Sequence, residues 1–164
     1  MNEKIIHAAV PGSTANLGPG FDTLGMALNL YAQVEMRFAE RLKIELVGDG
    51  LEGIPTDESN LVYQVAQMVF KKAGVQIQPL HIAIKSEVPS TRGLGSSAAA
   101  IVAGMGAANA LIGYPLKDED LFLMATALED HPDNVGASLF GGIVVAQWDG
   151  KRADYIQIEP HANL

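Results

Sequence analysis

The stretch PSTRGLGSSAA, Pro89–Ala99, places two glycines and a pair of serines directly before an uncharged, alanine-rich segment that predicts a helix over 96–112. The first backbone N–H groups of a helix lack partners within the helix, and the helix dipole favours negative charge there. Glycines let the backbone approach a phosphate, and a serine hydroxyl can donate to it or bind a metal. The stretch therefore predicts a phosphate-binding loop at Gly93–Ser97. It matches neither the P-loop nor the dinucleotide fingerprint.

A second glycine-rich stretch, PGSTANLGPGFD, spans Pro11–Asp22 and follows the strand-like residues 5–10. Its three glycines and two prolines predict an irregular loop, because neither a helix nor a central strand tolerates them. Asn16 can both donate and accept hydrogen bonds, and Asp22 is a charged acceptor. Ordered loops with a few polar side chains often carry function, so we expect these two side chains to bind a ligand.

A third stretch, EDHPDN, spans Glu129–Asn134 at the end of an apolar helical pattern. Pro132 predicts that one helix ends here and another begins. Three carboxylates, an imidazole and an amide fall within these six residues. The residues alone fit either a binding site or a charged, solvated turn between helices.

Together the three stretches resemble the GHMP kinases, the family of galactokinase, homoserine kinase, mevalonate kinase and phosphomevalonate kinase. Pro89–Ala99 fits the family's phosphate loop, P-x-x-x-G-L-G-S-S-A-A, at every specified position. Pro11–Asp22 and residues 129–142 are similar to the corresponding motifs of the homoserine kinase branch. The second of these departs from that branch at Asp130, Gly136 and Ser138.

The resemblance implies ATP-dependent phosphorylation of the hydroxyl group of L-homoserine, a step of threonine biosynthesis, with ATP and Mg²⁺ as cofactors. It implies a catalytic group of Asn134, Glu129 and Ser97, of which Ser97 and Glu129 bind the magnesium ion. It implies that Asn16, Asp22, His131 and Asn134 face the substrate, with Asp22 pairing the ammonium group. Expected nucleotide contacts are Pro89, Ser90, Thr91, Arg92, Gly93, Leu94, Gly95, Ser96 and Ser97, with Asn60 and Lys85 as further candidates.

The resemblance raises two chemical questions: which group accepts the proton of the substrate hydroxyl, and what Arg92 does. An amide such as Asn134 cannot act as a general base at neutral pH, so we expect direct attack by the substrate hydroxyl. Arg92 either screens phosphate charge or lies in solvent.

Hydrophobic periodicity predicts an α+β fold, a largely antiparallel sheet with helices on one face. The resemblance adds a likeness to domain 2 of ribosomal protein S5. The expected strands are 5–10, 31–39 (with Val34 out of phase), 42–47, 80–84, 142–148 and 153–158. The expected helices are one that is capped by Asp57 or Ser59 and runs to Ala73, and those at 96–112, 121–128 and 135–139. The resemblance implies that residues 1–164 form an N-terminal, ATP-binding domain, and that the family's C-terminal domain is absent from this chain.

Composition narrows the partners of this 164-residue chain. A net charge of −8, from 11 basic and 19 acidic residues, argues against nucleic acid. The absence of cysteine excludes disulfides and thiolate metal sites. The uncharged run 93–116 breaks at Gly113-Tyr-Pro115 and predicts a buried helix, not a membrane span. No apolar leader is visible, which predicts a cytoplasmic protein.

Three functions compete at this stage. The first is a homoserine kinase represented by its nucleotide-binding half. The second is another GHMP kinase that acts on a different small alcohol. The third is a non-catalytic nucleotide-binding fragment. The oligomeric state is open, with a homodimer as one option.

Overall fold

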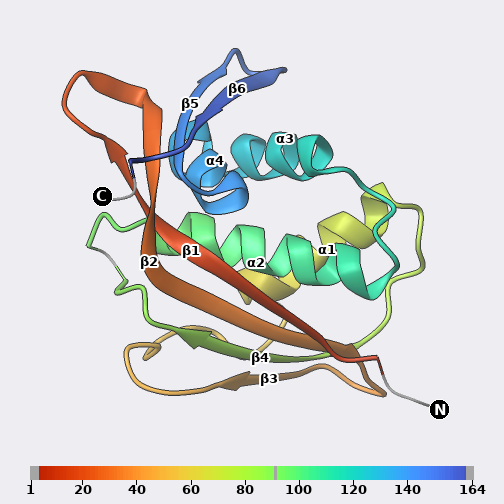
Figure 1. Ribbon diagram of the computed structural model, residues 1–164. Helices are drawn as coiled ribbons and strands as arrows, with labels where there is room; N and C mark the ends of the chain where they lie inside the picture. The colour runs from red at the N-terminus through yellow and green to blue at the C-terminus, as the bar shows by residue number, and fades with distance from the viewer. Residues whose placement is uncertain (1–3, 91, 162–164) are drawn as a thin grey trace.

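Six strands form one open sheet in the computed structural model, which describes residues 4–90 and 92–161, and four helices cover one face of that sheet (Figure 1). The strands are β1 (Ile6–Asn16), β2 (Gly20–Phe38), β3 (Lys43–Leu46), β4 (Leu80–Ser86), β5 (Ile143–Trp148) and β6 (Ala153–Ile158). The helices are α1 (Leu61–Lys72), α2 (Ser96–Leu111), α3 (Asp118–Glu129) and α4 (Pro132–Phe140).

The long strand β2 organises the sheet. It pairs antiparallel with β1 over most of its length, with β4 through its C-terminal half and with β5 near its N-terminal end. β5 pairs antiparallel with β6, and β3 and β4 form the parallel pair of the described sheet. The predicted α+β class, with a largely antiparallel sheet and helices on one face, is confirmed.

Alternation along β2 decides which side chains meet the helices. Ala32, Val34 and Met36 are 5%, 2% and 0% exposed, whereas Tyr31 is 36% exposed. Successive side chains of a strand point to opposite faces, so the even-numbered residues form the buried set. The expectation that Val34 falls out of phase was wrong, because Tyr31 is the residue that breaks the pattern.

Helix α2 lies at the centre of the fold and contacts β1, β2 and the other three helices. Its small side chains permit close packing: a Cβ atom on Gly104 would lie 2.6 Å from Val65 Cγ2 in α1. At its C-terminal end the Lys4 ammonium group donates to the carbonyl oxygen of Ala110 (2.5 Å), where a cation complements the helix dipole. None of the helices described is long and apolar enough to cross a membrane.

The stretch Pro11–Asp22 is a hairpin, so the prediction of an irregular loop was wrong. Its first half continues β1 and its end opens β2, with register shifts at Pro11/Ser13 and Ala15/Asn16. In the described sheet β1 pairs with β2 alone, and an edge strand with bulges tolerates proline and glycine. Positive φ angles at Asn16 (71°), Leu17 (38°) and Asp22 (52°) shape the turn between the strands.

Several helix ends differ from expectation: α3 and α4 each begin three residues earlier than predicted, and α1 has a different cap. Asn60, rather than Asp57 or Ser59, caps α1 by accepting from the backbone N–H of Tyr63 (3.2 Å). Asp57 instead accepts from the backbone N–H of Ser59 in the preceding turn (2.9 Å). The predicted break at Pro132 is confirmed, because α3 ends at Glu129 and Pro132 begins α4.

Candidate active site

The start of α2 is packed directly against β1 and α4. Gly95 adopts φ 64°, and a Cβ atom there would lie 2.2 Å from Ser13 Oγ and 3.0 Å from Asn134 Oδ1. The backbone N–H of Ser13 donates to the carbonyl oxygen of Leu94 at 3.0 Å. The predicted phosphate loop therefore lies against residues of both the first and the third motif.

The two side chains expected to bind magnesium come together beside this loop. Ser97, in the first turn of α2, donates through its hydroxyl to Glu129 Oε1 at 2.5 Å. Residues 97 and 129 thus place two hard oxygen atoms side by side, 32 positions apart in the chain. Mg²⁺ commonly takes one or two protein oxygens and completes its shell with phosphate oxygens and water, so this pair fits it. Nowhere in residues 4–90 and 92–161 do three or more acidic or histidine side chains gather in a group that could hold a metal.

Three of the expected substrate-binding residues also form one group. Asn16 Oδ1 accepts from the backbone N–H of Asp22 at 3.1 Å, which ties the two sides of the β1–β2 hairpin together. His131, which precedes α4, places Nδ1 3.6 Å from Asp22 Oδ1. The hairpin and the start of α4 therefore present a carboxylate, an amide and an imidazole together, an arrangement that suits a small ligand with an ammonium group.

The fourth expected substrate residue, Asn134, is held by side chains that the sequence analysis did not single out. Ser13 Oγ donates to Asn134 Oδ1 at 2.9 Å and lies 3.2 Å from Ser138 Oγ. Asp133 is buried, and its Oδ1 accepts from the backbone N–H of Asn134 at 2.7 Å. The sequence drew attention to Ser13 only as a member of the first motif and to Ser138 only as a departure from the third. Neither feature indicates which side chain the serine hydrogen-bonds.

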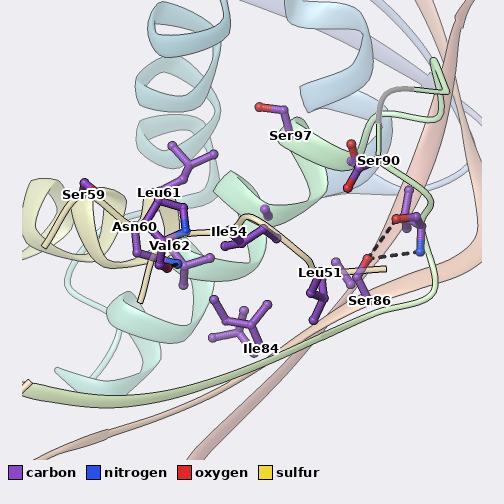
Figure 2. A pocket seen from close by; sticks show the side chains of 16 residues that line it. Leu51, Ile54, Ser59, Asn60, Leu61, Val62, Ile84, Ser86, Ser90 and Ser97 are labelled. Atoms are coloured by element: carbon purple, nitrogen blue, oxygen red, sulfur yellow. Dashed lines mark hydrogen bonds between the residues drawn. The ribbon is translucent and has the colours of Figure 1, made fainter. Parts of the chain in front are cut away.

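A cavity of about 290 Å³ opens beside the phosphate loop (Figure 2). Ser90 and Ser97 lie near the start of α2 in this view, and Leu51, Ile54 and Ile84 lie below them. The lining is otherwise mainly apolar and includes Leu51, Ile54, Leu61, Val62, Ile84 and Val88. A mainly apolar cavity with a few hydroxyl groups at one end suits a planar ring attached to a polar group.

Other expected nucleotide contacts lie in different surroundings. Lys85 is exposed and lines a separate hollow, because along β4 it alternates with the cavity-lining residues Ile84 and Ser86. Asn60 lines the cavity, but its amide nitrogen donates to the carbonyl oxygen of Pro55 (2.7 Å) while its oxygen caps α1.

Of the remaining residues of the phosphate loop, Arg92 is exposed. Thr91 lies outside the described residues.

Comparison with known proteins shows the family to which the chain belongs. Residues 60–142, half of the chain, match the GHMP kinases N terminal domain, and the chain belongs to this family. Within it, the chain is similar to curated homoserine kinases. The protein from Caldanaerobacter subterraneus subsp. tengcongensis is 49% identical over 156 residues, which cover 94% of this chain and 50% of that protein. The protein from Deinococcus radiodurans is 46% identical over 154 residues, with the same coverage. The chain thus spans about half the length of the curated relatives it matches.

Solved structures agree with the fold. The homoserine kinase from Cytophaga hutchinsonii superimposes with a TM-score of 0.83 at 29% identity, over 99% of this chain and 54% of that one. The L. major mevalonate kinase, solved with R-mevalonate, gives a TM-score of 0.72 at 17% identity, over 95% of this chain and 53% of that one. The second likeness shows the shared fold alone.

Proposed function

We propose that this chain is the N-terminal, nucleotide-binding domain of an ATP-dependent kinase that converts L-homoserine to O-phospho-L-homoserine, a step of threonine biosynthesis. The observation that carries the proposal is the meeting of three motifs around the first turn of α2: the phosphate loop, Ser13 of the first motif, and Glu129 and Asn134 of the third. Similarity to homoserine kinases at 46–49% identity favours homoserine over another small alcohol, the alternative substrate class.

The phosphate loop would hold the β- and γ-phosphates of ATP. The backbone N–H groups of Gly93–Ser97 supply donors at a helix N-terminus, where the dipole favours anions. The adjoining cavity of about 290 Å³ would take the nucleoside, because its apolar lining lies within reach of the same loop. Ser90, Ser96 and Ser97 line the cavity and belong to the Pro89–Ala99 stretch, so they would contact the nucleotide where its nucleoside joins the phosphates.

Ser97 and Glu129 would hold Mg²⁺ through the hydroxyl and carboxylate oxygens that now share a hydrogen bond. When bound, Mg²⁺ neutralises charge on the phosphates during transfer. Glu129 contributes to that neutralisation and orients Ser97, so its role is electrostatic and positional.

Asp22, Asn16 and His131 would bind the amino alcohol, with the Asp22 carboxylate pairing its ammonium group. Asn134 lies beside the phosphate loop, with its Oδ1 3.0 Å from the position of a Cβ atom on Gly95. Since an amide cannot accept the hydroxyl proton at neutral pH, Asn134 would position the reacting groups, and the substrate hydroxyl would attack directly. The substrate carboxylate is left to residues outside this chain. A cytoplasmic location and a homodimer stay predictions.

The nucleotide site can be tested on the chain itself. Addition of Mg-ATP to ¹⁵N-labelled protein should shift backbone amide resonances of Gly93–Ser97 most strongly. The control is the second glycine-containing loop, residues 49–53, whose resonances should move little. Largest shifts at 49–53 would show that the phosphate site has been misplaced, and the absence of any shift would favour a module that does not bind nucleotide.

A further inference from the structure

A chain of buried hydroxyl groups leads to the Asn134 amide. Ser13 is 0% exposed and donates to Asn134 Oδ1 at 2.9 Å. Ser138, one helical turn after Asn134 and 2% exposed, places its hydroxyl 3.2 Å from Ser13 Oγ. A serine hydroxyl has one hydrogen, and that of Ser13 points to Asn134, whose Oδ1 lies at 2.9 Å and whose backbone carbonyl oxygen lies at 3.2 Å, so we assign Ser138 as the donor to Ser13. The hydrogen bonds therefore run from Ser138 through Ser13 to Asn134.

The surroundings of Asn134 accept one orientation of its amide better than the other. Its oxygen receives the Ser13 hydroxyl, and its nitrogen lies 3.5 Å from Asp133 Oδ1, which can only accept when ionised. A flipped amide would place its oxygen against that carboxylate, while its nitrogen would donate to Ser13 Oγ, so the Asp133 carboxylate is the group that selects this orientation. Because the oxygen is occupied, Asn134 offers N–H donors to a ligand.

Ser13 also sets the spacing between Asn134 and the phosphate loop. Its backbone N–H donates to the carbonyl oxygen of Leu94 (3.0 Å), and its Oγ lies 2.2 Å from the position that a Cβ atom on Gly95 would take. One residue of the first motif thus fixes both the loop that would bind phosphate and the amide beside it.

We propose that Ser13, supported by Ser138, is a positioning residue that locks the Asn134 amide with its N–H donors available to the phosphoryl group in transfer. The inference rests on the proposed function and deepens it. A fixed donor stabilises negative charge on the phosphoryl oxygens without reorganising during the reaction. Asn134 then acts on the phosphoryl group, and Ser13 acts through Asn134.

The first test observes the amide directly. The Asn134 side-chain NH₂ resonances of the ¹⁵N-labelled chain are assigned by their loss in Asn134→Asp. We expect Ser13→Ala to move this pair towards the position of a solvent-exposed asparagine, and to reduce its response to Mg²⁺ with a non-hydrolysable ATP analogue. Unmoved resonances in Ser13→Ala would overturn the proposal.

Thr126→Val is the matched control for the loss of a buried hydroxyl. Thr126 lies in α3, is 0% exposed, and its hydroxyl has no hydrogen-bond partner among the described residues. Removing that hydroxyl should therefore leave the Asn134 resonances in place. A similar shift in both variants would mean that Ser13 has only a general structural role.

The second test is kinetic and uses a full-length version of the length of the curated relatives. Ser13→Ala should lower kcat about 10- to 100-fold, the order expected for misdirecting one electrostatic donor, with both KM values nearly unchanged. In an Asn134→Ala background the same change should have little further effect, because Ser13 acts through Asn134. Additive effects would overturn the proposal. If the wild type fails to phosphorylate homoserine, the proposed function fails, and the resonance test still decides the role of Ser13.

Discussion

At the scale of the residue, Gly93 and Gly95 form a natural comparison within one loop. Both adopt positive φ angles, 70° and 64°, but a Cβ atom on Gly93 meets nothing within 4 Å, whereas one on Gly95 collides with Ser13 Oγ. We predict that Gly93→Ala costs about 1–2 kcal/mol of stability for the left-handed backbone and weakens Mg-ATP binding less than Gly95→Ala does. Gly95→Ala should weaken Mg-ATP binding strongly, because it displaces the loop from β1 and α4.

Titration calorimetry with Mg-ATP, together with thermal unfolding, would separate these effects. Equal loss of affinity in the two variants would mean that backbone conformation, and not the contact with Ser13, governs the loop.

A second residue-scale prediction concerns Glu129 in a full-length version. Glu129→Gln should lower kcat strongly while nucleotide affinity stays within about tenfold, because the lost carboxylate acts mainly on charge that develops during transfer. The variant keeps the shape of the side chain and an oxygen that can still accept from Ser97. Steady-state kinetics and a nucleotide titration measure the two quantities separately. A kcat near that of the wild type would mean that Glu129 belongs to a charged, solvated turn and does not take part in phosphoryl transfer.

At the scale of the element, the solvent-facing side of β3 and β4 carries an ionic cluster. Lys43 Nζ lies 2.7 Å from Glu45 Oε1, and His81 Nε2 lies 2.5 Å from Glu45 Oε2. Hydrogen bonds from Lys43, and then from His81, lower the pKa of Glu45 below its ordinary value of 4.5. The cluster links the two strands of the parallel pair, since the backbone of Lys43 lies opposite His81.

This cluster predicts a pH dependence of stability. Because the folded-state pKa of Glu45 is lowered, its stabilising effect is complete above pH 4.5 and is lost as pH falls through the folded-state pKa. Urea unfolding should therefore show that Glu45→Gln destabilises the protein more at pH 7 than at pH 3. The exposed Glu40 provides the control, since Glu40→Gln should change little at either pH. An equal effect of Glu45→Gln at both pH values would contradict the prediction.

At the scale of the whole molecule, the chain buries a continuous core between the sheet and its helices. Apolar side chains stay exposed on β6, where Ile156 is 67% and Ile158 47% exposed. We predict that the 164-residue chain folds cooperatively but turns over homoserine poorly. Asp22 would hold the substrate ammonium, but the carboxylate anchor and closure of the site are left to chain outside this one.

The loss of both would reduce the rate by roughly four or more orders of magnitude, since each costs several kcal/mol of positioning. A coupled assay for ADP, with homoserine and Mg-ATP, measures turnover directly, and thermal unfolding checks the fold. Turnover in the ordinary enzyme range of about 1–10³ s⁻¹ would show that this domain contains more of the site than we assign to it.

Local features of the sequence determined the glycine-rich loop at 93–95, the buried helix that follows it and the break at Pro132. Each depends on backbone properties of a few consecutive residues: glycines that free the backbone, small apolar side chains and a proline that cannot donate. The match of Pro89–Ala99 to the family's loop likewise needed only adjacent residues.

The tertiary structure decided the rest. Pro11–Asp22 became a hairpin because β2 offered pairing partners that outweighed its glycines and prolines. Lys85 lies away from the cavity because the pairing of β4 with β2 decides which face of the sheet each β4 side chain occupies. Ser13 found its hydrogen-bond partner in Asn134, 121 positions later in the chain. Such partners are invisible to local patterns, because a serine or an asparagine hydrogen-bonds to whatever the packing of distant elements brings within reach.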